Sequence, residues 1–185
     1  MPNVCVFCGS RTGSQAFRSA AQSLGTAMAA RDWGLVYGGG HIGLMGVLAD
    51  AVLAGGGRVC GVIPRFLEAK ELAHRGVQEL LVVESMHERK ALMAERADAF
   101  LALPGGFGTA DELFEILTWR QLGLHDKPIA IWNVAGFFDP LIAWLERMVE
   151  EEYLSRASRG LLFVEHDLET LLNQVSKNMP KMGSR

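Results

Sequence analysis

The sequence predicts a single-domain α/β fold, with a doubly wound, mostly parallel sheet of the Rossmann-like kind and helices on both faces. Short apolar runs suited to buried strands alternate with segments of helical spacing along the whole chain. Three of these runs lead directly into a glycine-rich turn and then a helix, a junction typical of parallel sheets. With 185 residues, of which 49% are hydrophobic, the chain can bury one sizeable core.

The elements follow from this alternation. The first strand is expected near residues 3–8, where the chain is almost entirely apolar, and further strands near 34–38, 58–63, 80–84, 98–103, 128–132 and 161–164. Helices are expected between the strands, near 14–31, 44–55, 86–96, 109–123, 136–152 and 167–176. The irregular stretch 64–78 predicts a loop or helical segment over the carboxyl edge of the sheet. One domain is thus expected over 1–176, and residues 177–185 are expected to be a flexible, basic and polar tail.

The most informative stretch is PGGFGTADE, between an apolar strand and a segment of helical spacing. Its glycines, Gly105, Gly106 and Gly108, allow a sharp turn and a close approach of a ligand to the backbone. The free N–H groups and positive dipole end of the following helix favour a phosphate. Thr109 can cap that helix or offer its hydroxyl to the phosphate. The stretch therefore predicts an anion site, with the carboxylate of Glu112 one turn into the helix.

Three other interpretations of this loop compete with the anion site. Its spacing matches neither the P-loop, which needs a Lys after the last glycine, nor the dinucleotide fingerprint. A tight turn whose acidic residue complements the helix dipole stays open as the plain structural alternative. Further glycine turns, GGGHIGLMG after Tyr37 and Gly9-Ser10 after the first strand, weigh against it, because such turns gather where the strand order of a parallel sheet reverses. The sequence therefore predicts one ligand site built from all three turns.

Composition excludes several classes of protein. The net charge of −3, with mixed signs, argues against a nucleic-acid surface. No apolar run reaches the length of about eighteen residues that spans a membrane. The first strand begins almost at once, with no basic leader, and we therefore expect a cytoplasmic protein.

Neither the cysteines nor the histidines predict a metal or redox site. Cys5 and Cys8 have the spacing of a redox pair but lie within the first apolar strand, which favours apolar packing. The histidines are scattered without a pair at helical spacing, so no metal is expected. No lysine stands in a recognisable pyridoxal-phosphate context, and no cofactor is expected.

Arg89 is the second chemical clue. It follows Met86 by three residues and precedes Met93 by four, so all three lie on one helical stripe that should face the interior. A buried guanidinium requires a carboxylate or phosphate partner, because an uncompensated charge costs about 3 to 5 kcal/mol. Arg89 and Lys90 could meet an anionic ligand held by the glycine loop, with Glu112 nearby. A structural ion pair or a side chain that snorkels to solvent stays open as the alternative.

The motifs GGGHIGLMG, MHERK with Met93 after it, and PGGFGTADE followed by TWRQLG resemble the Lonely Guy (LOG) family of cytokinin riboside 5′-monophosphate phosphoribohydrolases. The resemblance runs from Val4 to about Phe138 and covers the opening CVFCGS. It implies a homodimeric, Rossmann-like hydrolase that splits a nucleoside 5′-monophosphate into a free base and ribose 5-phosphate. The apolar surplus in the later half of the chain, including Trp119 and Leu122, also favours a symmetric dimer. Family members have often been labelled lysine decarboxylases, a label that these residues do not support.

The resemblance assigns roles to particular residues. Arg89 and Glu112 match the catalytic pair of the family. Substrate contacts are expected from the three glycine turns, the irregular stretch 64–78 and the helices near 44–55, 86–96 and 109–123. The expected residues are Ser10, Gly39, Gly40, Gly43, Met45, Glu71, Arg89, Lys90, Gly105, Gly106, Phe107, Gly108, Thr109, Ala110, Asp111 and Thr118. Asp111 stands where many relatives have Glu, which keeps the charge but shortens its reach. Phe107 stands where many have Tyr, so a contact by that hydroxyl is lost.

The chemistry fits these residues. Cleavage of an N-glycosidic bond passes through an oxocarbenium-like state. A carboxylate such as Glu112 can stabilise the positive charge of this state or activate the attacking water. Arg89 could orient Glu112, contact the nucleotide or help the base depart. Two alternatives stay open: a broad-range purine or pyrimidine nucleotide nucleosidase in salvage, and a carrier that holds a phosphorylated ligand such as the molybdenum cofactor without hydrolysing it.

Overall fold

A computed structural model of the chain describes residues 1–180. Their strands are β1 (Asn3–Phe7), β2 (Gly34–Tyr37), β3 (Val59–Pro64), β4 (Glu79–Val83), β5 (Ala99–Ala102), β6 (Ile129–Trp132) and β7 (Leu162–Glu165). The helices are α1 (Gln15–Ala30), α2 (Gly43–Ala54), α3 (Met86–Arg96), α4 (Phe107–Gln121), α5 (Asp139–Glu150), α6 (Arg156–Arg159) and α7 (Leu168–Asn178), with 3-10 turns η1 (Arg65–Leu67) and η2 (Val134–Gly136).

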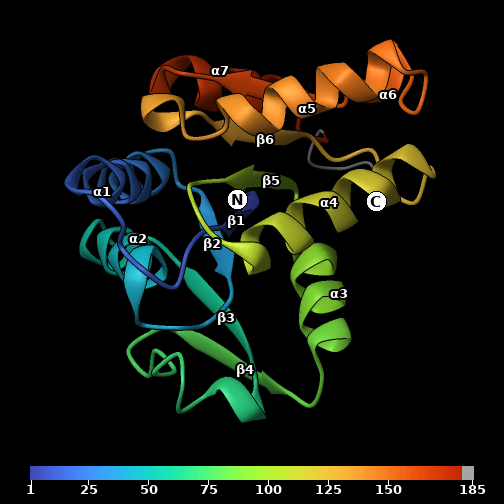
Figure 1. The fold of residues 1–185 in the computed structure, drawn as a ribbon. Coiled ribbons are helices and arrows are strands. Elements are labelled where there is room, and N and C mark those ends of the chain that lie inside the picture. The colour runs from blue at the N-terminus through green and yellow to red at the C-terminus, as the bar shows by residue number, and fades with distance from the viewer. Residues whose placement is uncertain (181–185) are drawn as a thin grey trace.

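These strands form one seven-stranded sheet in the order β4-β3-β2-β1-β5-β6-β7, and each neighbouring pair is parallel (Figure 1). The predicted fold class, a single doubly wound α/β domain, is confirmed. The chain leaves β1 toward β2 on one side and later returns to place β5 on the other side. The strand order therefore reverses between β1 and β5, which is where open α/β sheets bind their ligands.

Helices cover both faces of the sheet because the strand residues alternate. Val4 and Val6 of β1 lie in a core shared with α1, α2 and α7, whereas Cys5 and Phe7 lie in a second core shared with α3, α4 and α5. In Figure 1, α1 and α2 flank the sheet on one side and α3 and α4 on the other. No helix within residues 1–180 is both long and apolar enough to cross a membrane.

Several predicted boundaries were wrong by a few residues. α4 begins at Phe107 rather than at 109, and α5 begins at Asp139 rather than at 136, because η2, in which Ala135 has a φ of 51°, precedes it. The short helix α6 was not predicted. α7 runs to Asn178, so the first residues of the expected tail are helical, while the tail residues 181–185 lie outside the described part of the chain.

The three glycine turns contact one another at the carboxyl edge of the sheet. The N–H of Gly9 donates to the carbonyl of Pro104 at 3.1 Å, and the N–H of Leu44 donates to the carbonyl of Gly9 at 3.0 Å. Gly43 has a φ of +63°, and a Cβ there would lie 2.2 Å from the carbonyl carbon of Ser10. A larger residue at 43 would therefore separate the turn after β2 from the turn after β1. The predicted gathering of the turns is confirmed.

Candidate active site

A hollow of about 150 Å³ lies where these turns meet. The turn after β1, the start of α2, the segment between β3 and β4, α3 and the start of α4 all contribute to its wall. The lining residues are Val6, Cys8, Gly9, Ser10, Gly38, Met45, Glu71, Arg89, Gly106, Phe107, Gly108, Thr109 and Glu112. A larger hollow of about 550 Å³ adjoins it and shares Gly9, Ser10, Gly106 and Phe107 with it.

Most of the residues expected at the site line this hollow, including both members of the expected catalytic pair. Others stand beside it: Gly39, Gly40, Gly43, Lys90, Gly105, Ala110 and Asp111 belong to the same turns and helices without lining it. Thr118 does not join it, because three turns of α4 separate it from the helix start and it lines a separate groove against α5 and α6. Sequence reasoning missed Val6, Cys8, Gly9 and Gly38 as lining residues, although all four belong to glycine turns or to the strand before one.

Arg89 faces the interior, as its position between two methionines predicted. The residue is 4% exposed and Met93 is 1% exposed. Its Nη2 donates to Glu71 Oε2 at 3.0 Å and to the carbonyl of Gly38 at 2.7 Å, and its Nε donates to the carbonyl of Val62 at 3.1 Å. The expected carboxylate partner is thus Glu71, and snorkelling to solvent is excluded. These bonds fix the guanidinium at the wall of the hollow.

The turn after β2 makes room for this guanidinium. A Cβ on Gly38 would lie 2.2 Å from Arg89 Nη2. Any side chain at position 38 would displace the guanidinium. The first glycine of GGGHIGLMG is therefore needed to leave space for Arg89.

Glu112 lies in the same hollow, half-buried on α4. The pKa of its carboxyl is raised from 4.5 to about 7: burial is the main cause, the charges of Glu71 and Asp111 also raise it, and the charges of Arg89 and Lys90 oppose the shift. A carboxyl with a pKa near neutrality, facing a fixed cation in a cleft, is typical of a catalytic acid or base. The pair predicted from sequence is therefore brought together, with Arg89 held in place by Glu71.

Lys90 forms ion pairs with α4 and does not line the hollow. Its Nζ lies 3.0 Å from Asp111 Oδ2 and 3.1 Å from Glu115 Oε1. Burial alone would lower the pKa of Lys90, but the hydrogen bonds and charges of the two carboxylates raise it above its ordinary value. The ammonium thus ties α3 to α4 beside the site.

The start of α4 presents donors to the hollow. The cap residue is Gly106, and no side chain within residues 1–180 caps this helix, so of the two roles expected for Thr109 the capping role is wrong and the contact of its hydroxyl with a phosphate stays a prediction. Thr109 lies in the first turn instead, 5% exposed. The N–H groups of a first helical turn have no partner inside the helix, and the dipole makes this end positive. Phe107, the first residue of α4, is 98% exposed at the rim of both hollows.

The first-strand cysteines do not form a redox pair. Cys5 and Cys8 are buried free thiols that pack in the cores on opposite faces of the sheet. Burial raises the pKa of both thiols well above its ordinary value, which leaves them protonated and unreactive.

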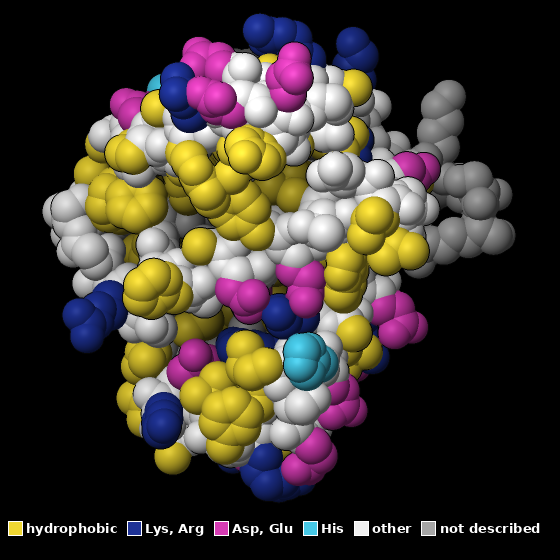
Figure 2. Space-filling model, turned by 45° about the vertical axis from the view of Figure 1, so that its right-hand side comes forward, with side chains coloured by type: hydrophobic (Ala, Val, Ile, Leu, Met, Phe, Trp, Pro, Cys, Tyr) yellow, Lys and Arg dark blue, Asp and Glu magenta, His cyan; other side chains and the backbone are white. Residues whose placement is uncertain are grey.

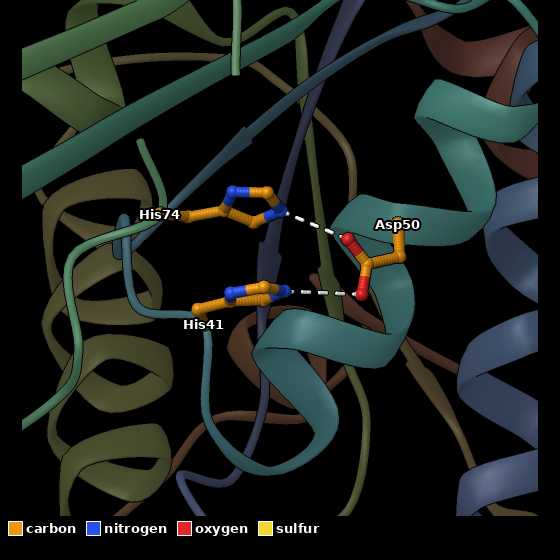
Figure 3. Close-up of side chains that lie close together, drawn as sticks. All are labelled: His41, Asp50 and His74. Carbon is orange, nitrogen blue, oxygen red and sulfur yellow. Dashed lines mark hydrogen bonds and ion pairs between the residues drawn. The ribbon is translucent and has the colours of Figure 1, made fainter. Parts of the chain in front are cut away.

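One side-chain cluster was not predicted. His41, Asp50 and His74 place ligand-type atoms within 4.8 Å of one another (Figure 3). The histidines were expected to be scattered, but His41 and His74 lie close together in the folded chain. Sequence spacing carried no signal, because the three residues come from the turn after β2, from α2 and from the segment between β3 and β4.

The fold and the site define a nucleotide-hydrolase type of protein: a doubly wound domain whose switch point holds a buried guanidinium, a carboxyl of raised pKa and an uncapped helix start. Comparisons with known proteins agree. The family described as "Possible lysine decarboxylase" matches residues 45–175. Cytokinin riboside 5'-monophosphate phosphoribohydrolase LOG1 of Arabidopsis thaliana is 44% identical over 179 residues, which cover 96% of this chain and 84% of the relative.

Probable cytokinin riboside 5'-monophosphate phosphoribohydrolase LOGL9 of Oryza sativa subsp. japonica is 47% identical over 178 residues, covering 96% of this chain and 78% of the relative. The chain therefore belongs to the LOG family of phosphoribohydrolases, and the predicted family and class of enzyme are confirmed. Among solved structures, the Moco carrier protein of Chlamydomonas reinhardtii superposes with a TM-score of 0.71 at 20% identity, over 95% of this chain and 96% of that one. This likeness shows the shared fold.

Proposed function

We propose that this protein hydrolyses the N-glycosidic bond of a nucleoside 5′-monophosphate, releasing the free base and ribose 5-phosphate. The cytokinin riboside 5′-monophosphates named for its relatives and AMP are the first substrates to test. The observation that carries the proposal is Glu112: its carboxyl, with a pKa raised to about 7, lies beside Arg89 and one turn from an uncapped helix start.

The reaction needs a negative charge near the anomeric carbon. As the bond to the base breaks, positive charge develops on the sugar, and the Glu112 carboxylate stabilises it or takes a proton from the attacking water. Arg89 keeps its position through Glu71 and the two carbonyls, so its charge faces Glu112 without reorganising during the reaction. The proposed catalytic pair is thus Arg89 and Glu112.

The proposal puts the 5′-phosphate of the substrate at the start of α4. The backbone from Gly105 to Thr109 turns along the boundary between the two hollows, where first-turn N–H groups can donate to an anion. The small hollow has less volume than the roughly 300 to 1,000 Å³ of a usual ligand pocket, so the nucleotide extends into the larger one. Binding energy from the phosphate then positions the ribose against Glu112.

A panel of 5′-monophosphates with release of base measured tests this proposal. We expect turnover of AMP or a cytokinin riboside monophosphate, and none of the matching nucleosides. A broad-range salvage nucleosidase would cleave many bases at similar kcat/KM. Tight binding of a phosphorylated ligand with no base released from any nucleotide would instead support the carrier alternative.

We further propose that the protein is a homodimer. On the face of α3 and α4, hydrophobic side chains gather beside a row of acidic and basic groups (Figure 2). Leu122 and Leu124 at the end of α4 are each 68% exposed, and Trp144 of α5, beside the groove that Thr118 lines, is 52% exposed. Apolar surface of this kind is typical of a subunit interface. Sedimentation at micromolar concentration should give about twice the 20.2 kDa of one chain, and a species of 20.2 kDa would contradict the proposal.

A further inference from the structure

The cluster of His41, Asp50 and His74 joins three parts of the chain beside the active site. His74 Nε2 lies 2.9 Å from Asp50 Oδ1, and His41 Nε2 lies 3.2 Å from Asp50 Oδ2. The two imidazole rings stack, with centroids 3.9 Å apart, and both face the one carboxylate (Figure 3). His74 is 5% exposed, whereas Asp50 lies on the solvent side of α2.

The geometry favours a carboxylate clamp over a metal site. A metal ion lies in the plane of each ligating imidazole, at about 2.0–2.1 Å from the nitrogen. Rings stacked at 3.9 Å and inclined by 23° send their in-plane lone pairs along nearly parallel lines, which do not meet at one ion. The N–H of Gly76 also donates to His74 Nδ1 at 3.2 Å, so in the neutral ring the proton sits on Nε2 and points at Asp50.

The clamp fixes the segment between β3 and β4. The N–H of His74 donates to the carbonyl of Gly39 at 2.9 Å, and the N–H of His41 donates to the carbonyls of Glu71 and Leu72, each at 3.0 Å. An isolated bridge pairs Gly40 with Ala73. The segment thus lies along the turn after β2. Asp50 links both the segment, through His74, and the turn, through His41, to α2.

This segment has little apolar burial of its own. Phe66 is 56% exposed and Leu72 is 60% exposed, and Leu72 has a φ of 47°, a strained conformation for a branched residue. Its position therefore depends on a few polar contacts, among which are the side-chain bonds between buried His74 and Asp50 of α2 and between Glu71 and Arg89 of α3.

Glu71 stands three residues before His74 and reaches into the hollow, where its Oε2 accepts from Arg89 Nη2. We propose that Asp50 is a positioning residue for the active site: through His74 it holds the segment 65–78 in register, and through Glu71 it fixes Arg89. The kinetic part of this inference rests on the proposed function, whereas the structural part does not.

The first experiment needs no substrate. In Asp50→Ala, we expect faster hydrogen exchange at the amides of His41 and His74 and faster trypsin cleavage after Lys70 and Arg75. The exchange rates of the amides in the strands should not change. Glu169→Ala is the matched control, because it also removes an exposed carboxylate, one paired with Arg31 far from the segment. Unchanged exchange and cleavage in Asp50→Ala would overturn the clamp, whether or not the protein hydrolyses nucleotides.

The second experiment is a double-mutant cycle with Glu71→Gln. Displacement of a positioned group by about 1 Å can lower activity by about a hundredfold, so we expect Asp50→Ala to reduce kcat/KM by roughly ten- to a hundredfold in the wild-type background. In the Glu71→Gln background, Asp50→Ala should change it less than about twofold, because the contact that Asp50 supports is already altered. Equal losses in both backgrounds would show general destabilisation and overturn the positioning role.

Asp50→Asn separates the hydrogen bond from the charge. Its Oδ1 still accepts from His74 Nε2, so we expect most of the activity and the exchange protection of the wild type to return. An Asn variant as impaired as Asp50→Ala would overturn the hydrogen-bond clamp. Absence of turnover in the wild-type protein, with the Asp50→Ala segment loosened, would refute the proposed hydrolase and leave the clamp standing.

Discussion

The two walls of the active-site hollow differ in how their polar groups are satisfied. On the α3 wall, Arg89 donates to Glu71 and to backbone carbonyls. On the α4 wall, Glu112 has a pKa raised by burial, and no side chain of the described residues 1–180 caps the helix start. The first wall is therefore pre-organised by internal partners, whereas the second leaves a carboxyl and a set of N–H groups for a substrate.

Glu112→Gln, on the α4 wall, should have the largest effect on activity. It keeps the shape of the side chain but removes the charge that the oxocarbenium needs, so we expect kcat to fall about a thousandfold or more, some 4 kcal/mol. Steady-state release of base from AMP measures it. A variant that keeps more than a tenth of the wild-type rate would remove Glu112 from the chemistry.

The same variant should be folded, and above neutral pH more stable than the wild type. The folded-state pKa of Glu112 is raised from 4.5 to about 7, so its protonation stabilises the fold below about pH 4.5, and this contribution is lost as the pH rises through about 7. Glutamine does not titrate. In urea unfolding at pH 8, the free energy of unfolding of Glu112→Gln should therefore exceed that of the wild type by about 2 kcal/mol.

Arg89→Ala tests the paired wall. We expect activity to fall by at least about a hundredfold, and the free energy of unfolding to fall by about 3 kcal/mol, because Glu71 is left as an uncompensated charge. Arg89→Ala combined with Glu71→Gln should recover part of the stability but none of the activity. If the single variant only unfolds and the double variant is fully active, Arg89 has a purely structural role.

Gly106→Val tests the uncapped wall. A Cβ at Gly106 meets no atom of residues 1–180 within 4 Å, so the fold should accept the side chain while the approach of the phosphate is obstructed. We expect KM for AMP to rise about tenfold or more, at least as much as kcat falls, in contrast to Glu112→Gln. Equal kcat/KM of the wild type for adenosine and AMP would show that this loop is a structural turn.

The smallest expected effect is that of pH. If Glu112 acts as a carboxylate, kcat/KM should rise about tenfold between pH 6 and pH 8, with a midpoint near its pKa of about 7. The residual activity of Glu112→Gln should lack this rise. A decrease of kcat/KM over the same interval would show that the protonated carboxyl is the active form.

Features that depend on local periodicity could be predicted from the amino-acid sequence. Alternating apolar runs predicted each strand, and the spacing of Met86, Arg89 and Met93 predicted an inward-facing guanidinium, because side-chain direction in a helix repeats every 3.6 residues. Three glycine turns after strands predicted where the site lies. Glu112 was found because it sits one turn into a helix that a glycine loop opens.

Which side chains contact one another depends on the tertiary fold. Sheet order brings the turn after β2 beside β1 and folds the segment between β3 and β4 against α2, so His41, Asp50 and His74 converge although no spacing links them. Packing of α3 on α4 directs Lys90 to Asp111 and Glu115, and the length of α4 carries Thr118 to another groove. The pKa of Glu112 depends on desolvation by its neighbours, a property of three-dimensional burial that sequence periodicity does not encode.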